Sequence, residues 1–314
     1  MLRSNWLGQS VCVAVVCVLT VSAASADSFG TGTNQFTIDF VTISGNTNPT
    51  SGLGIVNNDY RIGVYEITND QWEKFNASLP HPVLGDPASA YDNAPSWTGT
   101  SIPTNQVSWY EAAQFVNWLN TGTGHQAAYK FTGTEGTSGY TFATWSSAEA
   151  AGGTNLYRHK DAMYYLPSED EWVKAAYWNG TALQTYANAS PSDLLGGVPD
   201  PAKWNYSPSA GSEPWVVGAG REELNGTFDM MGNAWEWTES PWNDPGYGIA
   251  SNRATRGGSY GYSSDTLTSL AVGRLFPFFE MADTGFRVAS GVPEHASVAL
   301  VCLGGLALLR RTRA

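Results

Sequence analysis

The most informative part of this chain is a ten-residue stretch, Phe228-Asp229-Met230-Met231-Gly232-Asn233-Ala234-Trp235-Glu236-Trp237. A plain strand or turn would hold too many large side chains next to polar ones. A loop wrapped around a cation accommodates them, because Asp229 and Glu236 can supply carboxylate oxygens and Gly232 and Ala234 can turn their carbonyls to the same point. A hard cation such as Ca²⁺ takes about six to eight oxygen ligands. The stretch therefore predicts a calcium loop or, as the alternative, a tryptophan-rich core turn with solvated acids.

The composition indicates a domain with many turns and an aromatic core. Aromatic residues make up 13% of the chain and charged residues 14%, and there are 34 glycines, a balance that favours loops over long regular elements. In the calcium interpretation, Trp235 and Trp237 pack inward and hold the loop closed. A chain of 314 residues can form one large domain or two ordinary ones. Because no internal repeat or linker interrupts it, we expect a single domain over residues 27–290.

The beginning of the chain has the pattern of a secretory signal peptide. Arg3 precedes an apolar run at residues 11–21, and Ala24-Ser25-Ala26 is a small-residue cleavage site. An N-terminal membrane anchor is the weaker alternative, because the apolar run is short for a membrane span. We therefore expect residues 1–26 to be removed after Ala26 and the protein to be exported.

The end of the chain combines a Val292-Pro293-Glu294 segment, an apolar stretch at residues 296–309 and an arginine cluster at residues 310–313. The arginines would stay on the cytoplasmic side of a membrane. The tail at residues 291–314 resembles the PEP-CTERM sorting signal, which implies cutting by a membrane protease of the exosortase type. His295 departs from that signal, which usually has proline there. A permanent membrane anchor is the alternative, and either predicts a location at the cell surface, outer envelope or extracellular matrix.

The three cysteines, Cys12, Cys17 and Cys302, all lie in these two ends. Residues 27–291 therefore contain no disulfide, no thiolate metal ligand and no cysteine nucleophile. The same residues hold 12 Lys and Arg against 27 Asp and Glu, a net charge of −15. This charge argues against a nucleic-acid partner and is compatible with calcium binding outside the cell.

Local patterns predict three short helices and several short strands. Capping-box spacings start the helices at Thr68, Ser108 and Ser168, with expected ends near Leu79, Asn120 and Trp178. The fourth residue of each box, Gln71, Glu111 or Glu171, is expected to serve the helix start and not chemistry. Alternating apolar residues predict a strand through Phe36, Ile38 and Phe40. Further strands are expected at residues 60–67, 256–260 and 284–289, an elaborated loop or hairpin at 124–160, and loops at 181–225.

Six segments, taken in this order, resemble the formylglycine-generating-enzyme (sulfatase-modifying factor) family. They lie at residues 62–69, 103–109, 165–172, 232–237, 256–259 and 285–288. The resemblance implies a single α+β domain related to C-type lectins, poor in regular secondary structure and stabilised by calcium. It also implies that Asp229, Gly232, Ala234 and Glu236 hold calcium. A second calcium site would begin at Asn205 and Tyr206, although no clear acidic partner follows before Trp215.

The chemistry of the family has no counterpart here. Its oxidase members use two cysteines shortly after an Arg-Gly-Gly-Ser motif to bind copper(I), a soft ion that prefers thiolates. In this chain Tyr262 stands about where the first cysteine would be, and residues 260–268 contain no thiol. We therefore expect no copper and no formylglycine formation by that mechanism.

Two function classes remain. The first is a non-catalytic, calcium-stabilised binding module for a peptide, protein or glycan, with its surface in residues 260–282. Candidate contacts are Tyr260, Tyr262, Arg274, Phe276, Phe278 and Phe279, while the alternative for the phenylalanines is a core position. The second class is a metal-dependent oxidoreductase that acts on an exported polypeptide by a cysteine-free variant of the family chemistry. A purely structural matrix component is a third and weaker alternative.

Overall fold

The computed structural model describes residues 25–81, 83, 95–188, 194–206, 213–242 and 246–293. Residues 1–24 of the predicted signal peptide and the predicted tail beyond residue 293, including His295, lie outside these ranges. The last residues of the predicted signal peptide, Ser25 and Ala26, pair with Phe40 and Asp39 in the first strand. Within the described ranges, no helix has the length and apolar character needed to cross a membrane.

Two sheets form the centre of the molecule. The larger has the order β1-β2-β3-β13-β8, and all of its pairs are antiparallel. The smaller has the order β11-β10-β9-β12, in which β12 runs parallel to β9. The strands of the larger sheet are β1 (Ser25–Phe29), β2 (Phe36–Ile43), β3 (Tyr60–Gly63), β8 (Tyr164–Tyr165) and β13 (Ala289–Gly291). Those of the smaller sheet are β9 (Trp235–Pro241), β10 (Arg253–Arg256), β11 (Gly273–Leu275) and β12 (Thr284–Gly285).

The predicted strands are confirmed at residues 36–40 and in part at 60–67 and 284–289, whereas the one predicted at 256–260 is wrong beyond its first residue. In β2 the apolar side chains of Phe36, Ile38 and Phe40 are buried and alternate with exposed neighbours, as predicted. The strand expected at residues 60–67 ends at Gly63, because the backbone then turns toward other partners: Val64 O accepts from Phe228 N and Ile67 N donates to Phe286 O. The observed strand β10 comes earlier than the one expected at 256–260 and shares only Arg256 with it, because the backbone at Gly257 and Gly258 turns into the left-handed region. The one expected at 284–289 is divided between β12 and β13, which lie in different sheets.

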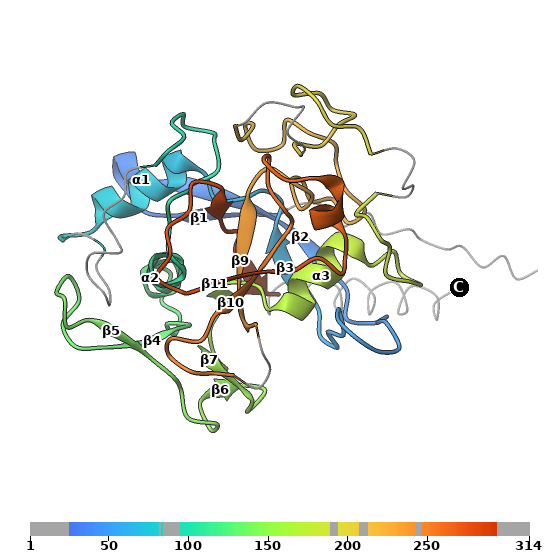
Figure 1. Ribbon diagram of the computed structural model, residues 1–314. Coiled ribbons are helices and arrows are strands. Elements are labelled where there is room, and N and C mark those ends of the chain that lie inside the picture. Colours follow the sequence, from blue (N-terminus) through green and yellow to red (C-terminus); the bar gives the residue numbers. More distant parts are fainter. Residues whose placement is uncertain are drawn as a thin grey trace, which may run out of the picture.

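Three helices begin where the capping boxes predict. They are α1 (Asn69–Ser78), α2 (Trp109–Gly122) and α3 (Glu169–Tyr177). In α2 and α3 the fourth-position glutamate accepts a hydrogen bond of 2.7 Å from the backbone N–H of Ser108 or Ser168, so these residues serve the helix starts as expected. Helix α2 continues two residues past its predicted end. Figure 1 shows α1 and α2 on one side of the central strands and α3 on the other.

The remaining described chain is mostly loop, with two small hairpins. The hairpin or loop expected at residues 124–160 contains two antiparallel pairs, β4 (Lys130–Thr132) with β5 (Thr141–Ala143) and β6 (Ala150–Ala151) with β7 (Asn155–His159). The described residues also include two single-turn 3-10 helices, η1 (Gly32–Asn34) and η4 (Ser264–Leu267). Aromatic residues dominate the core, as the composition predicts; fully buried examples are Trp109, Trp172, Trp204, Trp237, Tyr60, Tyr129, Tyr157 and Tyr177.

Candidate functional site

The loop before β9 is tightly curled by three residues in the left-handed backbone region. Asp229, Gly232 and Asn233 have φ angles of 63°, 90° and 60°. Aspartate and asparagine tolerate this conformation better than other side chains. Glycine is required at position 232, because a Cβ there would lie 2.1 Å from the carbonyl oxygen of Asn205. The curl turns the amide groups of the loop toward two buried glutamates.

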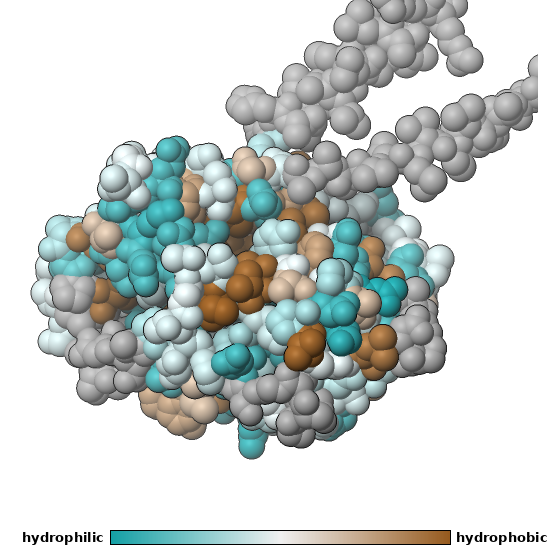
Figure 2. All heavy atoms as spheres, turned by 90° about the horizontal axis from the view of Figure 1, so that it is seen from above, coloured by the Kyte–Doolittle hydropathy of each residue, from teal (hydrophilic) through white to brown (hydrophobic). Residues whose placement is uncertain are grey.

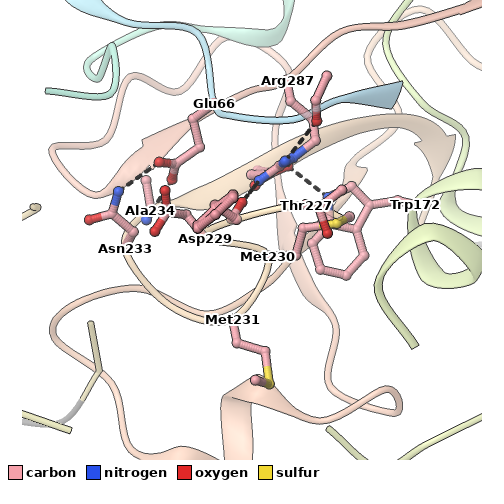
Figure 3. A network of polar contacts seen from close by, with 12 residues as sticks. Glu66, Trp172, Thr227, Asp229, Met230, Met231, Asn233, Ala234 and Arg287 are labelled. Carbon is pink, nitrogen blue, oxygen red and sulfur yellow. Dashed lines mark hydrogen bonds and ion pairs between the residues drawn. The ribbon is translucent and has the colours of Figure 1, made fainter. Parts of the chain in front are cut away.

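These two glutamates, Glu66 and Glu223, were not singled out by the sequence. Glu66 accepts hydrogen bonds from Asn233 Nδ2 at 2.6 Å and from Ala234 N at 3.0 Å. Glu223 accepts from Met230 N at 3.1 Å, from Met231 N at 2.9 Å and from the Thr227 hydroxyl. Figure 3 shows Glu66, Asn233 and Ala234 meeting on one side of the loop. Glu66 lies in a segment that carries the family resemblance, but no sequence signal pointed to Glu223.

The two carboxylates that the sequence did predict are also buried and already hydrogen-bonded. Asp229 Oδ2 accepts from Gly218 N at 2.6 Å. Glu236 forms a bidentate ion pair with Arg287, at 2.5 Å and 2.6 Å, and its Oε2 also accepts from Trp172 Nε1 at 2.7 Å. Arg287 is itself buried, and its other donors reach the carbonyl oxygens of Gly63, Val64 and Phe228.

One arginine thus faces four buried carboxyl groups, those of Glu66, Glu223, Asp229 and Glu236. Burial raises the pKa of Glu66 well above its usual range, and the neighbouring charges of Asp229 and Glu236 raise it further. Burial raises the pKa of Glu223 to about 8 and that of Asp229 to about 6. If all four groups were ionised, their negative charge would exceed the single positive charge of Arg287, and a divalent cation would favour the ionised forms.

The predicted calcium ligands fit this arrangement in part. Asp229, Gly232 and Ala234 share one curled loop, and only Oδ2 of Asp229 accepts the hydrogen bond from Gly218 N. Glu236, in contrast, would have to share its oxygens with Arg287 and Trp172. In the part of the chain that the structure describes, no three His, Cys, Asp or Glu side chains are grouped to hold a metal, so backbone carbonyls would have to complete the set.

At the second predicted calcium position, Asn205 is buried and its Oδ1 has no hydrogen-bond partner among the described residues. Its Nδ2 donates to Glu213 O at 3.1 Å and to Asn233 Oδ1 at 3.0 Å. The side chain of Tyr206 points elsewhere and donates to Leu194 O at 3.1 Å. An unpartnered buried amide oxygen is a suitable cation ligand. Asn205 and Tyr206 therefore both remain predicted ligands of a second calcium ion.

A pocket of about 390 Å³ lies on the smaller sheet, next to the loop. Its aromatic wall is Trp235 and Tyr262, which meet edge to face with ring centroids 5.7 Å apart. Its polar groups come from elements far apart in the sequence, and they are Asp265, Asp283, Arg274, Thr255, Thr266 and Thr284. Gly273 lets β11 approach the wall, because a Cβ there would lie 2.3 Å from Thr255 Oγ1 and 3.4 Å from the Trp235 ring.

Two of the six predicted ligand contacts line this pocket and four do not. Tyr262 and Arg274 belong to its wall, and the guanidinium of Arg274 lies 4.5 Å from the ring centre of Trp242. Tyr260 is nearly buried, and its hydroxyl accepts a hydrogen bond of 3.0 Å from Trp97 Nε1. Phe276, Phe278 and Phe279 lie outside the pocket wall.

Phe276, Phe278 and Phe279 contact one another with ring centroids 5.1–5.5 Å apart. Phe276 and Phe279 are 44% and 39% exposed, so the alternative of a core position is wrong for these two, while Phe278 packs partly against the core. On the face of the molecule shown in Figure 2, hydrophobic side chains form several small patches separated by polar ones.

The inward packing predicted for both tryptophans of the loop is confirmed for one of them. Trp237 is fully buried, and its Nε1 donates to Val107 O. Trp235 is only half-buried and lines the pocket. The two indoles share one face of β9, but Trp235 stands at the beginning of the strand, where the pocket opens.

Comparison with known proteins identifies the family of this domain and two of its relatives. Residues 28–292 match the family described as sulfatase-modifying factor enzyme 1-like domain. The chaperone protein LppX of Paenibacillus barcinonensis is 24% identical over 271 residues, which cover 76% of this chain and 82% of that protein. Hercynine oxygenase of Mycolicibacterium smegmatis is 27% identical over 250 residues, which cover 74% of this chain and 52% of that enzyme. The chain therefore spans about half the length of that relative.

The fold itself recurs in solved structures. Treponema denticola variable protein 1 superimposes with a TM-score of 0.60 at 20% identity, covering 85% of this chain and 99% of that one. This similarity and the three helices among many short strands confirm the predicted single α+β domain, and they are consistent with a C-type-lectin-like fold. The chain therefore belongs to the sulfatase-modifying factor enzyme 1-like family, whose domain spans residues 28–292.

Proposed function

We propose that this member of the family is an exported binding module and that its ligand occupies the pocket beside Trp235 and Tyr262. The observation that carries the proposal is the chemistry of that pocket: its wall holds phenol, hydroxyl, carboxylate and guanidinium groups, and residues 27–291 contain no cysteine. A soft copper(I) ion needs thiolate or similar ligands. The family's copper chemistry therefore lacks its ligands, whereas a recognition pocket needs only what is present.

Calcium is part of the proposal as a structural ion. It would be held by Asp229 and by the carbonyls of Gly232 and Ala234, with Glu236 contributing if Arg287 releases one of its oxygens. The excess of buried carboxylates over arginine supports it. Export through the signal peptide and exosortase-type cutting of the tail would place the domain at the cell surface or in the extracellular matrix.

The proposal is tested by binding of the mature, secreted protein to envelope and matrix fractions of the producing cells. Saturable binding is expected, and Tyr262→Ala should weaken it at least about tenfold, because the variant removes half of the aromatic wall. Leu270→Ala is the matched control, since Leu270 is 87% exposed in the same segment but lies outside the pocket wall. Equal binding by the native protein and Tyr262→Ala would count against the pocket.

A second candidate function is a metal-dependent oxidoreductase that acts on an exported polypeptide and uses no cysteine of its own. The 27% identity to an oxygenase favours it. Its test is oxygen consumption by the mature protein with iron(II) or copper(I) and cysteine-containing peptides. Consumption that Tyr262→Ala or Arg274→Ala abolishes would establish this function, whereas consumption no greater than that of the free metal would remove it.

A further inference from the structure

We propose that the pocket beside Trp235 binds a sugar residue of a glycan. This inference rests on the proposed binding function and specifies its ligand class. The volume of about 390 Å³ is at the small end of ligand pockets, which run from about 300 to 1,000 Å³. It therefore suits about one or two sugar rings and not a folded partner.

The aromatic wall supplies one half of the recognition. Gly273 packs against the Trp235 ring, and Tyr262 lies with its edge toward it, so the indole cannot swing away without disturbing β11. Tyr262 is 46% exposed, which leaves a rigid, partly solvated aromatic surface. Such a surface suits the C–H face of a pyranose ring, which is apolar although its edges are polar.

The polar groups supply the other half, and they present both donors and acceptors. Asp265 and Asp283 offer carboxylate oxygens, while Arg274 offers only N–H donors. Stacking against Trp242 at 4.5 Å holds the guanidinium at the rim. Asp283 is fixed as well, because its Oδ2 accepts from Ser259 Oγ at 3.1 Å. A sugar hydroxyl both donates and accepts, so it can use groups of both kinds.

Other small ligands match these walls less well. A phosphate or carboxylate ligand would be repelled by the two aspartates, and an organic cation, although attracted by them, would leave the Arg274 donors without a partner. A wholly apolar ligand would exclude water from these charged groups and threonine hydroxyls without pairing their remaining donors and acceptors, which is unfavourable. A neutral ligand with many hydroxyls can pair with such donors and acceptors.

An independent observation points to a missing hydroxylated partner. Thr284 belongs to the pocket wall and is 1% exposed, and its Oγ1 has no hydrogen-bond partner anywhere in the described chain. An unpartnered buried hydroxyl destabilises the free protein. A ligand hydroxyl, directly or through a water, would satisfy it.

The test is calorimetric titration of the mature protein with cellobiose, maltose and N,N′-diacetylchitobiose, with lysine amide and tetramethylammonium as cationic probes. We expect at least one disaccharide to bind at millimolar or better affinity, with little dependence on sodium chloride. Thr284→Val, which keeps the side-chain shape, should weaken that binding about tenfold, the loss expected for one hydrogen bond. The same variant should raise the melting temperature by about 2–4 °C, because the unpaired hydroxyl is gone.

Thr104→Val is the matched control. Thr104 is also fully buried with an unpartnered hydroxyl, but it is not in the pocket wall. It should gain stability in the same way and leave sugar binding unchanged.

Three outcomes would overturn the inference: no disaccharide binds, Thr104→Val and Thr284→Val weaken binding equally, or only the cationic probes bind with an affinity that salt reduces. In each case envelope binding that depends on Tyr262 would still support the proposed function. Absence of both sugar binding and envelope binding would contradict the sugar-binding inference and the proposed function together.

Discussion

Arg287 joins the loop that contains the predicted calcium ligands to the strand and loop residues around it. Its guanidinium joins Glu236 to the carbonyls of Gly63, Val64 and Phe228. It is also the counter-charge for the surrounding buried acids, and their charges raise the pKa of Arg287 itself. The ion pair crosses 51 residues of sequence, so a single side chain connects the end of the domain to its central loop.

We expect Arg287→Met to lower the free energy of unfolding by about 3–5 kcal/mol, because it leaves buried carboxylates without their cation. Denaturant unfolding of the mature protein measures this. Arg274→Met, which removes an exposed arginine, should change stability by no more than about 0.5 kcal/mol. A loss below about 1 kcal/mol for Arg287→Met would show that the carboxyl groups are neutral or otherwise compensated.

At the scale of elements, β9 connects the two candidate sites. Its first residue, Trp235, lines the pocket, and the next, Glu236, points to the opposite face and pairs with Arg287. Because side chains alternate along a strand, the two candidate sites are separated by one residue of β9. Helix α3 supports the same strand, since Trp172 donates to Glu236 and Glu169 N donates to Ser240 Oγ.

The start of α3 is therefore a sensitive point. Ser168→Ala removes the hydroxyl that accepts from Glu171 N at 3.2 Å, and we expect it to cost about 1 kcal/mol of stability. Ser78→Ala is a suitable comparison, because Ser78 is the last residue of a different helix, α1, and its hydroxyl only donates to Lys74 O within that helix. If the two substitutions cost the same in thermal unfolding, the cap contributes nothing specific.

For the whole molecule, the ends of the described chain meet in one sheet. Strand β13 lies between β3 and β8, and Asp27 of β1 is held by Arg61 at 2.6 Å and by the Tyr164 hydroxyl at 2.8 Å. Cutting after Ala26 would leave Asp27 and these contacts in place. The buried acids at the centre then make the stability of the whole domain depend on pH and on any bound cation.

In a chelator, we expect the free energy of unfolding to fall as pH rises from about 5 to about 8. The pKa values of Asp229 and Glu223 are raised to about 6 and about 8 in the folded protein, above their usual values of 3.8 and 4.5. The folded state therefore binds protons more tightly than the unfolded state, and this stabilisation is lost as the groups ionise. Urea unfolding at several pH values measures the slope.

Calcium should flatten this slope by stabilising the ionised carboxylates, and Glu223→Gln should reduce it without any calcium. Melting of the native domain at the same temperature with calcium and with chelator would reject the calcium site. A stability independent of pH in chelator would instead show that the acids are already compensated.

The amino-acid sequence alone determined the features that depend on neighbouring residues or on composition. Each capping box spans four residues, so its hydrogen bonds form within one short segment. Ser108 and Ser168 therefore mark helix starts independently of the surrounding fold. The absence of cysteine from residues 27–291 likewise excludes a copper(I) dithiolate without any structure. The tertiary structure decided the partners: it brought Arg287 to Glu236, buried Glu66 and Glu223 beside them, and gathered Asp283, Arg274 and Trp235 around one pocket. These contacts join residues far apart in the chain, and their charge states follow from burial, which no local pattern encodes.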